Sequence, residues 1–390
     1  MTHSAILIAS GFLLTAFAVE RLGRLWGIPP VIVLIAIGLA SKPLLANAGL
    51  ALEGLDVAVP IIGTIGLILI VLEGALDIEL RRERLKAAAG AFALAVGGFA
   101  FCLAVLVPIA AFALGLSPFQ AAILAVPFAV ISSAVAIPSS HFLPSHGREF
   151  VVYETSLSDI LGVLVFFALL NSDGSLAGVL AELVGGGALS LVLAAVCAVG
   201  LVLVLMRIDG HIRFVPLLAG LFGLYAAGKL LHLSPLILVL LFGLALNNPG
   251  LITRWRPLRN WMDESYGATL NEFKVLVLEL TFAVRGFFFI LLGYWTDLAD
   301  LASFRAWLAA ALIVVVIYGS RDLLLRLGRH ELARSLIWIA PRGLITVLLF
   351  LSAKEALPVP GFLNGTVMLV VLASAMLIVL ARWRADRPGT

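Results

Sequence analysis

The chain has 390 residues, of which 62% are hydrophobic and only 13% are charged. A soluble domain of this size carries about 25% charged residues, so the composition excludes an ordinary soluble protein. The formal net charge of +3 does not indicate a nucleic-acid partner, because basic residues in membrane proteins mostly mark cytoplasmic loops.

Apolar runs of about 18 to 25 residues, each long enough to cross a bilayer as a helix, recur from end to end. The sequence therefore predicts an all-α polytopic membrane protein with about 13 transmembrane helices, surrounded by membrane lipid. In chain order the expected spans are 4–19, 28–46, 57–76, 87–113, 118–138, 150–170, 178–206, 213–231, 234–248, 270–295, 305–326, 333–353 and 362–383.

The first apolar run is expected to be a membrane helix and not a cleaved signal. No Lys or Arg precedes it, and the basic residues follow it, which is the reverse of the order in a signal peptide. The two cysteines, Cys102 and Cys197, fall inside apolar runs. They indicate small buried side chains and give no sign of a disulfide, a metal site or a cofactor.

Positive charge is distributed unevenly between the two sets of loops. If the N-terminus is outside, the inward loops carry 19 of the 26 basic residues and the outward loops carry 4. This asymmetry predicts an N-terminus outside and a C-terminus inside. The inward residues are Arg21, Arg24, Arg81, Arg82, Arg84, Lys86, Arg148, Arg207, Arg213, Arg254, Arg256, Arg259, Arg321, Arg326, Arg329, Arg334, Arg382, Arg384 and Arg387, and the outward ones are Lys42, Lys229, Arg305 and Lys354.

The loops are short. The longest, about 249–269, is too short for a soluble domain. No stretch matches the GxxxxGK[ST] pattern that cradles nucleotide phosphates, so a nucleotide partner is not expected.

The sixth span begins with an unusually polar stretch, YETSLSDILG at 153–162. An ionisable residue at membrane depth costs about 2.5 to 3.5 kcal/mol on insertion scales, so it usually has a partner or a function. On a helix Thr155 shares a face with Asp159, and Glu154 shares a face with Ser158. Asp159 with its hydroxyl neighbours suits a monovalent cation or a proton. The alternative is that both carboxylates merely begin a helix near the interface.

Arg342 is the expected cationic partner of Glu154. It lies within the twelfth span, in IWIAPRGLITVLLFLSA, between Pro341 and Gly343. Proline removes a backbone donor and glycine loosens the helix, so this span should break here. Broken helices at membrane depth are tolerated only where protein or water lines them.

The fifth span contains a counterpart, AVISSAVAIPSS, with Ser132, Ser133 and Pro138. Two interrupted helices in corresponding halves indicate an inverted-repeat secondary transporter with its site at the midplane. Two ordinary kinked helices are the alternative. Nearer the span ends, Glu73, Glu279 and Arg285 are expected to extend to the interface, as long charged side chains do.

Several of these stretches resemble the electroneutral branch of the monovalent cation/proton antiporters, which includes bacterial sodium/proton exchangers and their animal relatives. ETSLSD resembles the family's ESLLND segment, and ISSAVAI lies where the family has ATDPVAV. PRGLITV resembles LRGAVSI, LEGALDIELRR resembles FLEGGLELDL, and YGSRD resembles the stretch that holds a basic residue. The order and spacing of the matches span nearly the whole chain.

The resemblance implies a scaffold bundle that forms a homodimer and a mobile transport core that carries the site past it. The scaffold would comprise residues 1–82 and 173–302, and the core residues 83–172 and 303–390.

The resemblance also implies residue roles. Asp159 would alternately bind the cation and the proton, with Thr155 as a neighbouring ligand. Glu154 would pair with Arg342 to hold the core together, and Arg321 would be a modulating basic residue near the site.

The sequence departs from the family pattern where the broken helices cross. The family's Thr-Asp-Pro is Ser132-Ser133-Ala134 here, and its Asn-Asp is Ser158-Asp159. One carboxylate is therefore missing. Hydroxyls and carbonyls are weaker ligands than a second carboxylate, so a weakly hydrated ion such as K⁺ becomes more plausible beside Na⁺.

Three hypotheses follow. The first is an electroneutral exchanger of Na⁺ or K⁺ for H⁺ in a bacterial inner membrane, with Asp159, Ser132, Ser133, Thr155 and Ser158 around the ion. The second is a channel-like or sensor relative that does not exchange ions. The third is an organic-anion carrier, which would need a free Arg342. None of the three is an enzyme.

Overall fold

The computed structural model describes most of the chain. The described residues are 2–26, 28–47, 55–78, 85–186, 214–230, 235–248, 265–328 and 333–385, with a few positions between 188 and 200. About half of the seventh predicted span, 178–206, lies outside these residues, and so does most of the predicted loop 249–269.

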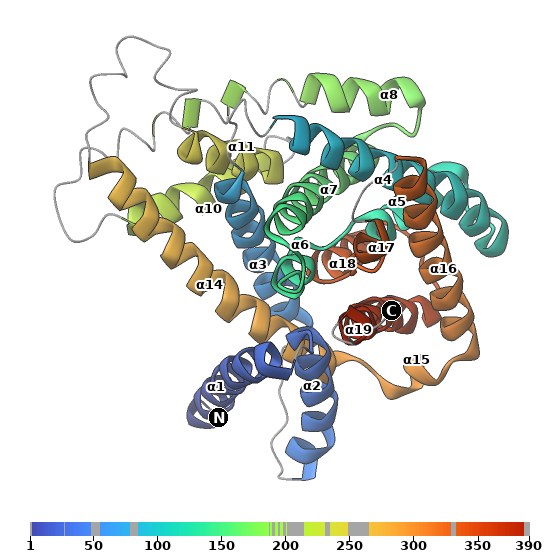
Figure 1. Ribbon diagram of the computed structural model, residues 1–390. Helices are drawn as coiled ribbons and strands as arrows, with labels where there is room; N and C mark the ends of the chain where they lie inside the picture. Colours follow the sequence, from blue (N-terminus) through green and yellow to red (C-terminus); the bar gives the residue numbers. More distant parts are fainter. Residues whose placement is uncertain are drawn as a thin grey trace. The chain divides into compact units, whose positions relative to one another are not determined.

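Within the described residues the regular secondary structure is entirely helical (Figure 1). The elements are α1 (Thr2–Trp26), α2 (Pro30–Asn47), α3 (Leu55–Asp77), α4 (Leu85–Leu114), α5 (Pro118–Ala129), α6 (Ser133–Ser139), α7 (Ser145–Asn171), α8 (Leu176–Ala181), the π-helical turn η2 (Glu182–Gly186), α10 (Phe214–Leu230), α11 (Pro235–Asn247), α14 (Ser265–Trp295), α15 (Leu298–Ala302), α16 (Phe304–Leu327), α17 (Ala333–Leu336), α18 (Leu344–Ala356) and α19 (Phe362–Ala385).

The helices confirm an all-α, multi-pass membrane protein. Seven described helical stretches are long and apolar enough to cross a membrane, and shorter apolar helices accompany them. Apart from the seventh, each predicted span overlaps one described helix or a pair of short helices. The total of 13 spans stays a prediction.

Contacts divide the chain into two units, the first comprising Met1–Leu67, Gly90–Asp159 and Phe282–Thr390, the second Ile68–Ala89 and Ile160–Thr281. In the second unit α10 packs on α11. There the side-chain amides of Asn247 and Asn248 donate to the carbonyl of Ile78 at 3.0 and 2.9 Å. These bonds satisfy a backbone acceptor just past the end of α3.

In the first unit, which contains all the candidate site residues, α16 packs along α19 and α5 packs on α18. Helices α2 and α14 approach with almost no space between their backbones. A Cβ added at Gly38 would lie 2.1 Å from the carbonyl oxygen of Ile290, and one added at Gly293 would lie 2.3 Å from that of Ile35. Small residues of this kind let membrane helices come together at close range.

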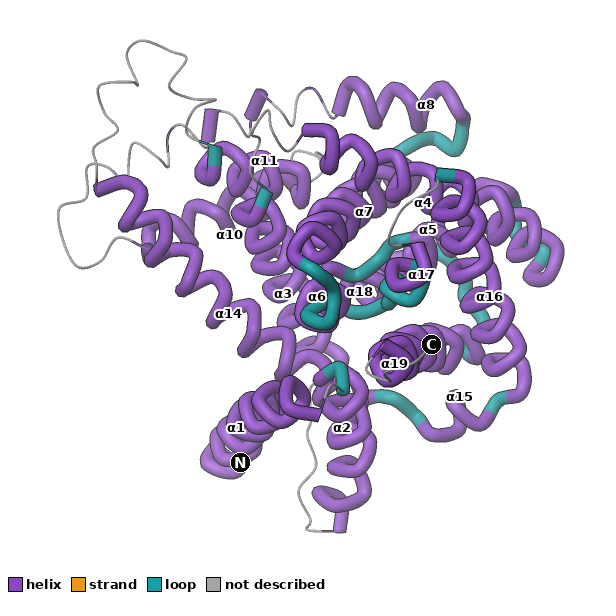
Figure 2. Tube along the Cα trace, in the orientation of Figure 1, coloured by secondary structure: helices purple, strands orange, loops and turns teal. Residues whose placement is uncertain are grey.

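Two helices break in the first unit, as the sequence predicts. Helix α5 ends at Ala129, and Val130 is extended before α6 begins. Helix α17 ends at Leu336, and non-helical chain continues to Gly343 before α18 begins. Figure 2 shows both interruptions as loops between the short helices.

The two interruptions are bonded to each other. The backbone N–H of Ser132 donates to the carbonyl of Pro341 at 2.9 Å. Gly343 allows this approach, because a Cβ there would lie 2.6 Å from Oγ of Ser132 and 2.9 Å from Cγ2 of Val135. The crossing therefore joins the ends of four short helices at one point.

Candidate functional site

Asp159 lies on α7 beside this crossing and is only 6% exposed. Its Oδ2 accepts a hydrogen bond from Oγ of Ser133 at 2.5 Å and a longer one from the backbone N–H of Ser133 at 3.4 Å. Ser133 is the first residue of α6. Both bonds come from the first helical residue after the break, so the break aims donors at the carboxylate.

The second carboxylate oxygen, Oδ1, is buried and has no hydrogen-bond partner among the described residues. An unpaired buried polar atom is uncommon, because it has lost water and gained nothing in exchange. A proton or a bound cation would each satisfy this oxygen. The arrangement can therefore bind either, but not both on the same oxygen.

The other predicted ligands are placed as follows. Oγ of Ser158 accepts from the backbone N–H of Ile131 at 2.9 Å, so it lies against the break after α5. Ser132 lies in the break itself, with its N–H bonded to Pro341. The hydroxyl of Thr155, one turn from Asp159, donates to the carbonyl of Val151 at 2.8 Å. Cation binding by these groups stays a prediction.

The expected partner of Glu154 was wrong. Its carboxylate binds Arg321 on α16 through two hydrogen bonds of 2.5 and 2.8 Å. Both side chains are buried, at 1% and 4% exposed. Nε of Arg321 also donates to the carbonyl of Leu336, the last residue of α17, at 2.7 Å. Arg321 thus neutralises Glu154 and caps one broken helix.

Arg342 binds backbone carbonyls. Its Nε donates to the carbonyl of Phe128 at 2.7 Å, and its terminal nitrogens donate to those of Ala340 and Ala129 at 3.3 and 3.5 Å. Phe128 and Ala129 end α5, where the last carbonyls have no partner within the helix. A cation also favours a helix C-terminus. The break leaves these carbonyls without donors in their own helix. Arg342 donates to them, which explains why it does not pair with Glu154.

Ser374 on α19 was missed by the sequence reasoning. Its Oγ accepts from the backbone N–H of Arg342 at 2.9 Å and donates to the carbonyl of Val371 at 3.1 Å. It fixes the non-helical segment that carries Arg342. The signal was faint, because Ser374 is one of two small hydroxyl residues in this apolar span, the other being Thr366.

The expectation that Arg285 extends to the interface was also wrong. Its side chain is 15% exposed and donates from Nη1 to the carbonyl of Ala134, in the first turn of α6, at 3.2 Å. This residue therefore reaches the helix that carries Ser133.

Apolar spanning helices, two broken helices that cross, and a buried carboxylate at the crossing define an ion-coupled membrane transporter. A profile of the family described as "Sodium/hydrogen exchanger, transmembrane" matches residues 6–383. The chain belongs to this family, as the sequence motifs indicated. It is accordingly a transmembrane antiporter of the cation/proton exchange class, and its family is one of transporters and not of enzymes.

Two solved structures of the sodium proton antiporter MjNhaP1 from Methanocaldococcus jannaschii have the same fold. The first, at pH 8, has a TM-score of 0.74 at 21% identity and covers 98% of this chain and 97% of its own. The second, from an electron-microscopy map, has a TM-score of 0.70 at 20% identity and covers 98% and 96%. Curated protein sequences give no significant match.

Proposed function

We propose that the protein exchanges Na⁺ or K⁺ for H⁺ by alternating access, with Asp159 binding the cation and the proton in turn. The observation that carries the proposal is that Oδ1 of buried Asp159 has no hydrogen-bond partner within the described ranges, beside an Oδ2 that Ser133 holds in place. Competition between cation and proton for one carboxylate couples their movements without a further energy source or cofactor.

The cation would complete its shell with oxygen ligands from the crossing. We propose Ser132, Ser133, Thr155 and Ser158 together with backbone carbonyls. Position 133 is a serine and not a carboxylate, so the site would carry one negative charge. A singly charged site suits a monovalent cation, and its weaker field reduces the preference for the more strongly hydrated Na⁺ over K⁺.

The proposed cycle uses the division into a scaffold, 1–82 and 173–302, and a transport core, 83–172 and 303–390. The core would carry Asp159 from one side of the membrane to the other, and the scaffold would form a homodimer. We further propose a bacterial inner membrane, with the N-terminus outside and the C-terminus inside, from the distribution of basic residues.

The proposal is tested in proteoliposomes that contain the purified protein and a preset pH gradient. External Li⁺, Na⁺, K⁺ or Rb⁺ is added in separate trials. We expect Na⁺, K⁺ or both to dissipate the gradient in a saturable manner. A channel-like relative would instead pass cations without moving protons in the opposite direction, and a sensor would leave the gradient intact.

A further inference from the structure

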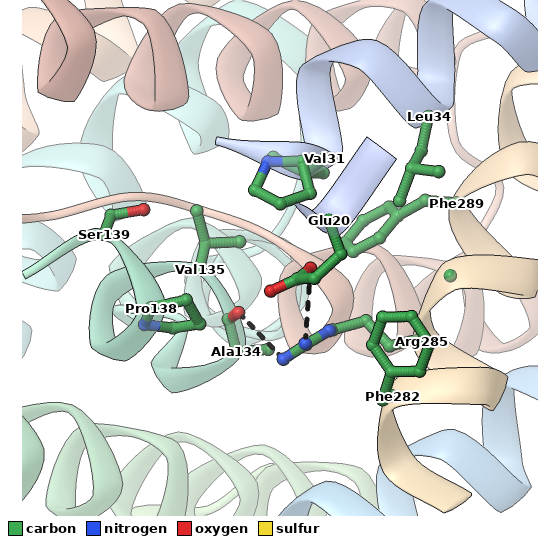
Figure 3. A pocket seen from close by; sticks show the side chains of 12 residues that line it. Glu20, Val31, Leu34, Ala134, Val135, Pro138, Ser139, Phe282, Arg285 and Phe289 are labelled. Carbon is green, nitrogen blue, oxygen red and sulfur yellow. Dashed lines mark hydrogen bonds and ion pairs between the residues drawn. The ribbon is translucent and has the colours of Figure 1, made fainter. Parts of the chain in front are cut away.

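Arg285 on α14 lies between α1 and α6, at the edge of a small cavity (Figure 3). Its Nη1 donates to the carbonyl of Ala134 at 3.2 Å, and its Nη2 lies 3.9 Å from Oε2 of Glu20. The side chains of Arg285 and Glu20 are 15% and 11% exposed. Figure 3 shows the guanidinium directed at both partners.

The carbonyl of Ala134 needs a donor from elsewhere because of its sequence position. In an α-helix the carbonyl of residue i accepts from the N–H of residue i+4. For Ala134 this residue is Pro138, which has no N–H. An unpaired carbonyl away from water is costly, and Arg285 supplies the missing donor.

This carbonyl belongs to the turn that builds the site. Ser133, the preceding residue, makes both hydrogen bonds to Asp159. Ser132, one residue earlier, is bonded to Pro341. The first turn of α6 is therefore held from three directions, by α7, by the α17–α18 interruption and by Arg285.

We propose that Arg285, oriented by Glu20, is a positioning residue for the ion site: it fixes the first turn of α6 and thereby the bonds from Ser133 to Asp159. The inference rests on the proposed function of Asp159. It assigns Arg285 no contact with the transported ion. A purely structural ion pair between Arg285 and Glu20 would stabilise the fold without acting on α6 in particular.

The test compares four purified proteins in proteoliposomes: wild type, Arg285→Met, Arg285→Lys and Arg326→Met. Methionine keeps an apolar stem but has no N–H, and lysine restores a charged donor. Arg326 is the matched control, because it is 73% exposed and pairs with Asp322 on its own helix. Initial exchange rates are measured against Na⁺ concentration, and K⁺ replaces Na⁺ if the wild type prefers it. Amide hydrogen exchange of residues 130–139 is measured on the same proteins.

We expect Arg285→Met to raise the half-saturating cation concentration about tenfold, the size of a lost charge-assisted hydrogen bond. Amide exchange of residues 130–139 should become faster in the same variant. Arg285→Lys should recover most of both properties, and Arg326→Met should match the wild type. Glu20→Gln should act in the same direction as Arg285→Met but more weakly, because it leaves the donor in place.

Pro138→Ala provides the decisive comparison. Alanine at 138 has an N–H that can donate to the carbonyl of Ala134, so it removes the need for Arg285. We expect Pro138→Ala to rescue much of the loss in Arg285→Met. If Arg285→Met alone does not fold, Arg285→Lys and the rescued double variant are expected to fold and to carry the comparison.

The inference is overturned if Arg285→Met and Arg326→Met show the same amide hydrogen exchange in α6 and the same half-saturating cation concentration. It is also overturned if adding Pro138→Ala to Arg285→Met restores neither property. Failure of the proposed function looks different. In that case wild-type protein would not exchange ions, while amide exchange would still show whether Arg285 holds α6.

Discussion

The two oxygens of Asp159 are in different surroundings. Oδ2 is held by Ser133, and Oδ1 is buried without a hydrogen-bond partner in the part of the chain that the structure describes. We predict that Asp159→Asn abolishes cation-driven proton flux in proteoliposomes while the melting temperature in detergent changes little. Asparagine keeps the shape of the side chain but cannot release a proton.

The matched control for this substitution is Asp173→Asn. Asp173 lies in the exposed turn between α7 and α8, where the hydroxyl and N–H of Ser175 lower the pKa of its carboxyl. The control should exchange at the wild-type rate. Appreciable flux through Asp159→Asn would show that another group couples the two ions.

The buried pair of Glu154 and Arg321 leads to a second prediction at the residue scale. Removing one partner of such a pair leaves an uncompensated buried charge and costs about 3 to 5 kcal/mol. Glu154→Gln and Arg321→Gln should each lower the melting temperature sharply. The double variant should lose less than the sum of the two losses, because the single variants share one interaction.

The same set of single and double variants, made with Glu154 and Arg342, distinguishes the two arginines. Arg342 binds the carbonyls of Phe128, Ala129 and Ala340. Arg342→Gln should destabilise the protein. Its coupling energy with Glu154→Gln should be much smaller than the coupling energy between Glu154→Gln and Arg321→Gln. Strong coupling between Glu154 and Arg342, with additivity between Glu154 and Arg321, would contradict the pairing in the structure.

At the scale of elements, the crossing depends on a close approach at Gly343. A Cβ there would meet Oγ of Ser132 at 2.6 Å, so α6 and the chain before α18 would have to move apart. We predict that Gly343→Ala destabilises the protein by about 1 to 3 kcal/mol, as overpacking does. It should also impair exchange, because Ser132 adjoins Ser133. Thermal unfolding and flux measurements check both effects.

Gly319 on α16 is the matched control. A Cβ at this position would have no neighbouring atom of the described residues within 4 Å. Alanine favours a helix over glycine by about 0.5 to 1 kcal/mol, so Gly319→Ala should be neutral or stabilising. Equal losses in the two variants would mean that contact at the crossing is not the cause.

At the scale of the whole molecule, the charges at the crossing predict how exchange responds to voltage. Glu154 is neutralised by Arg321, and position 133 is a serine. Asp159 would then carry one cation in one direction and one proton in the other. Both loaded forms have the same charge, so a full cycle moves no net charge.

The membrane potential supplies about 2.3 kcal/mol per elementary charge per 100 mV, and an electroneutral cycle does not use it. We predict that imposing about −100 mV leaves the initial cation-driven proton flux nearly unchanged relative to no potential. Valinomycin with K⁺ sets the voltage, and another permeant ion replaces it if K⁺ is transported. A several-fold acceleration would reveal a second titrating group, and Glu154 would be the first to test.

Much of the architecture follows from local sequence. Long apolar runs predict helices because the bilayer satisfies no backbone group, so each span must satisfy its own. The Pro341–Gly343 stretch interrupts a helix for reasons that lie within a few residues, and so the break was predictable. Asp159 and Ser133 were also recognisable in the sequence, since a carboxylate and a hydroxyl in apolar spans are conspicuous, and the structure bonds them to each other. The roles of Asp159, Ser132, Ser133, Thr155 and Ser158 as ion ligands stay a prediction.

The partners of the buried charges were decided by tertiary structure. Glu154 and Arg321 are 167 residues apart in the sequence. From the sequence alone Arg342 is an equally reasonable partner for Glu154, but the fold places Arg342 against the last carbonyls of α5. From the sequence alone Arg285 likewise resembles an interfacial side chain. In the folded chain it lies beside α6 and donates to the carbonyl of Ala134, to which Pro138 has no N–H to donate. Helix formation and helix breaking depend on neighbours along the chain. Ion pairs and caps depend on which helix ends meet, and only the folded chain brings those ends together.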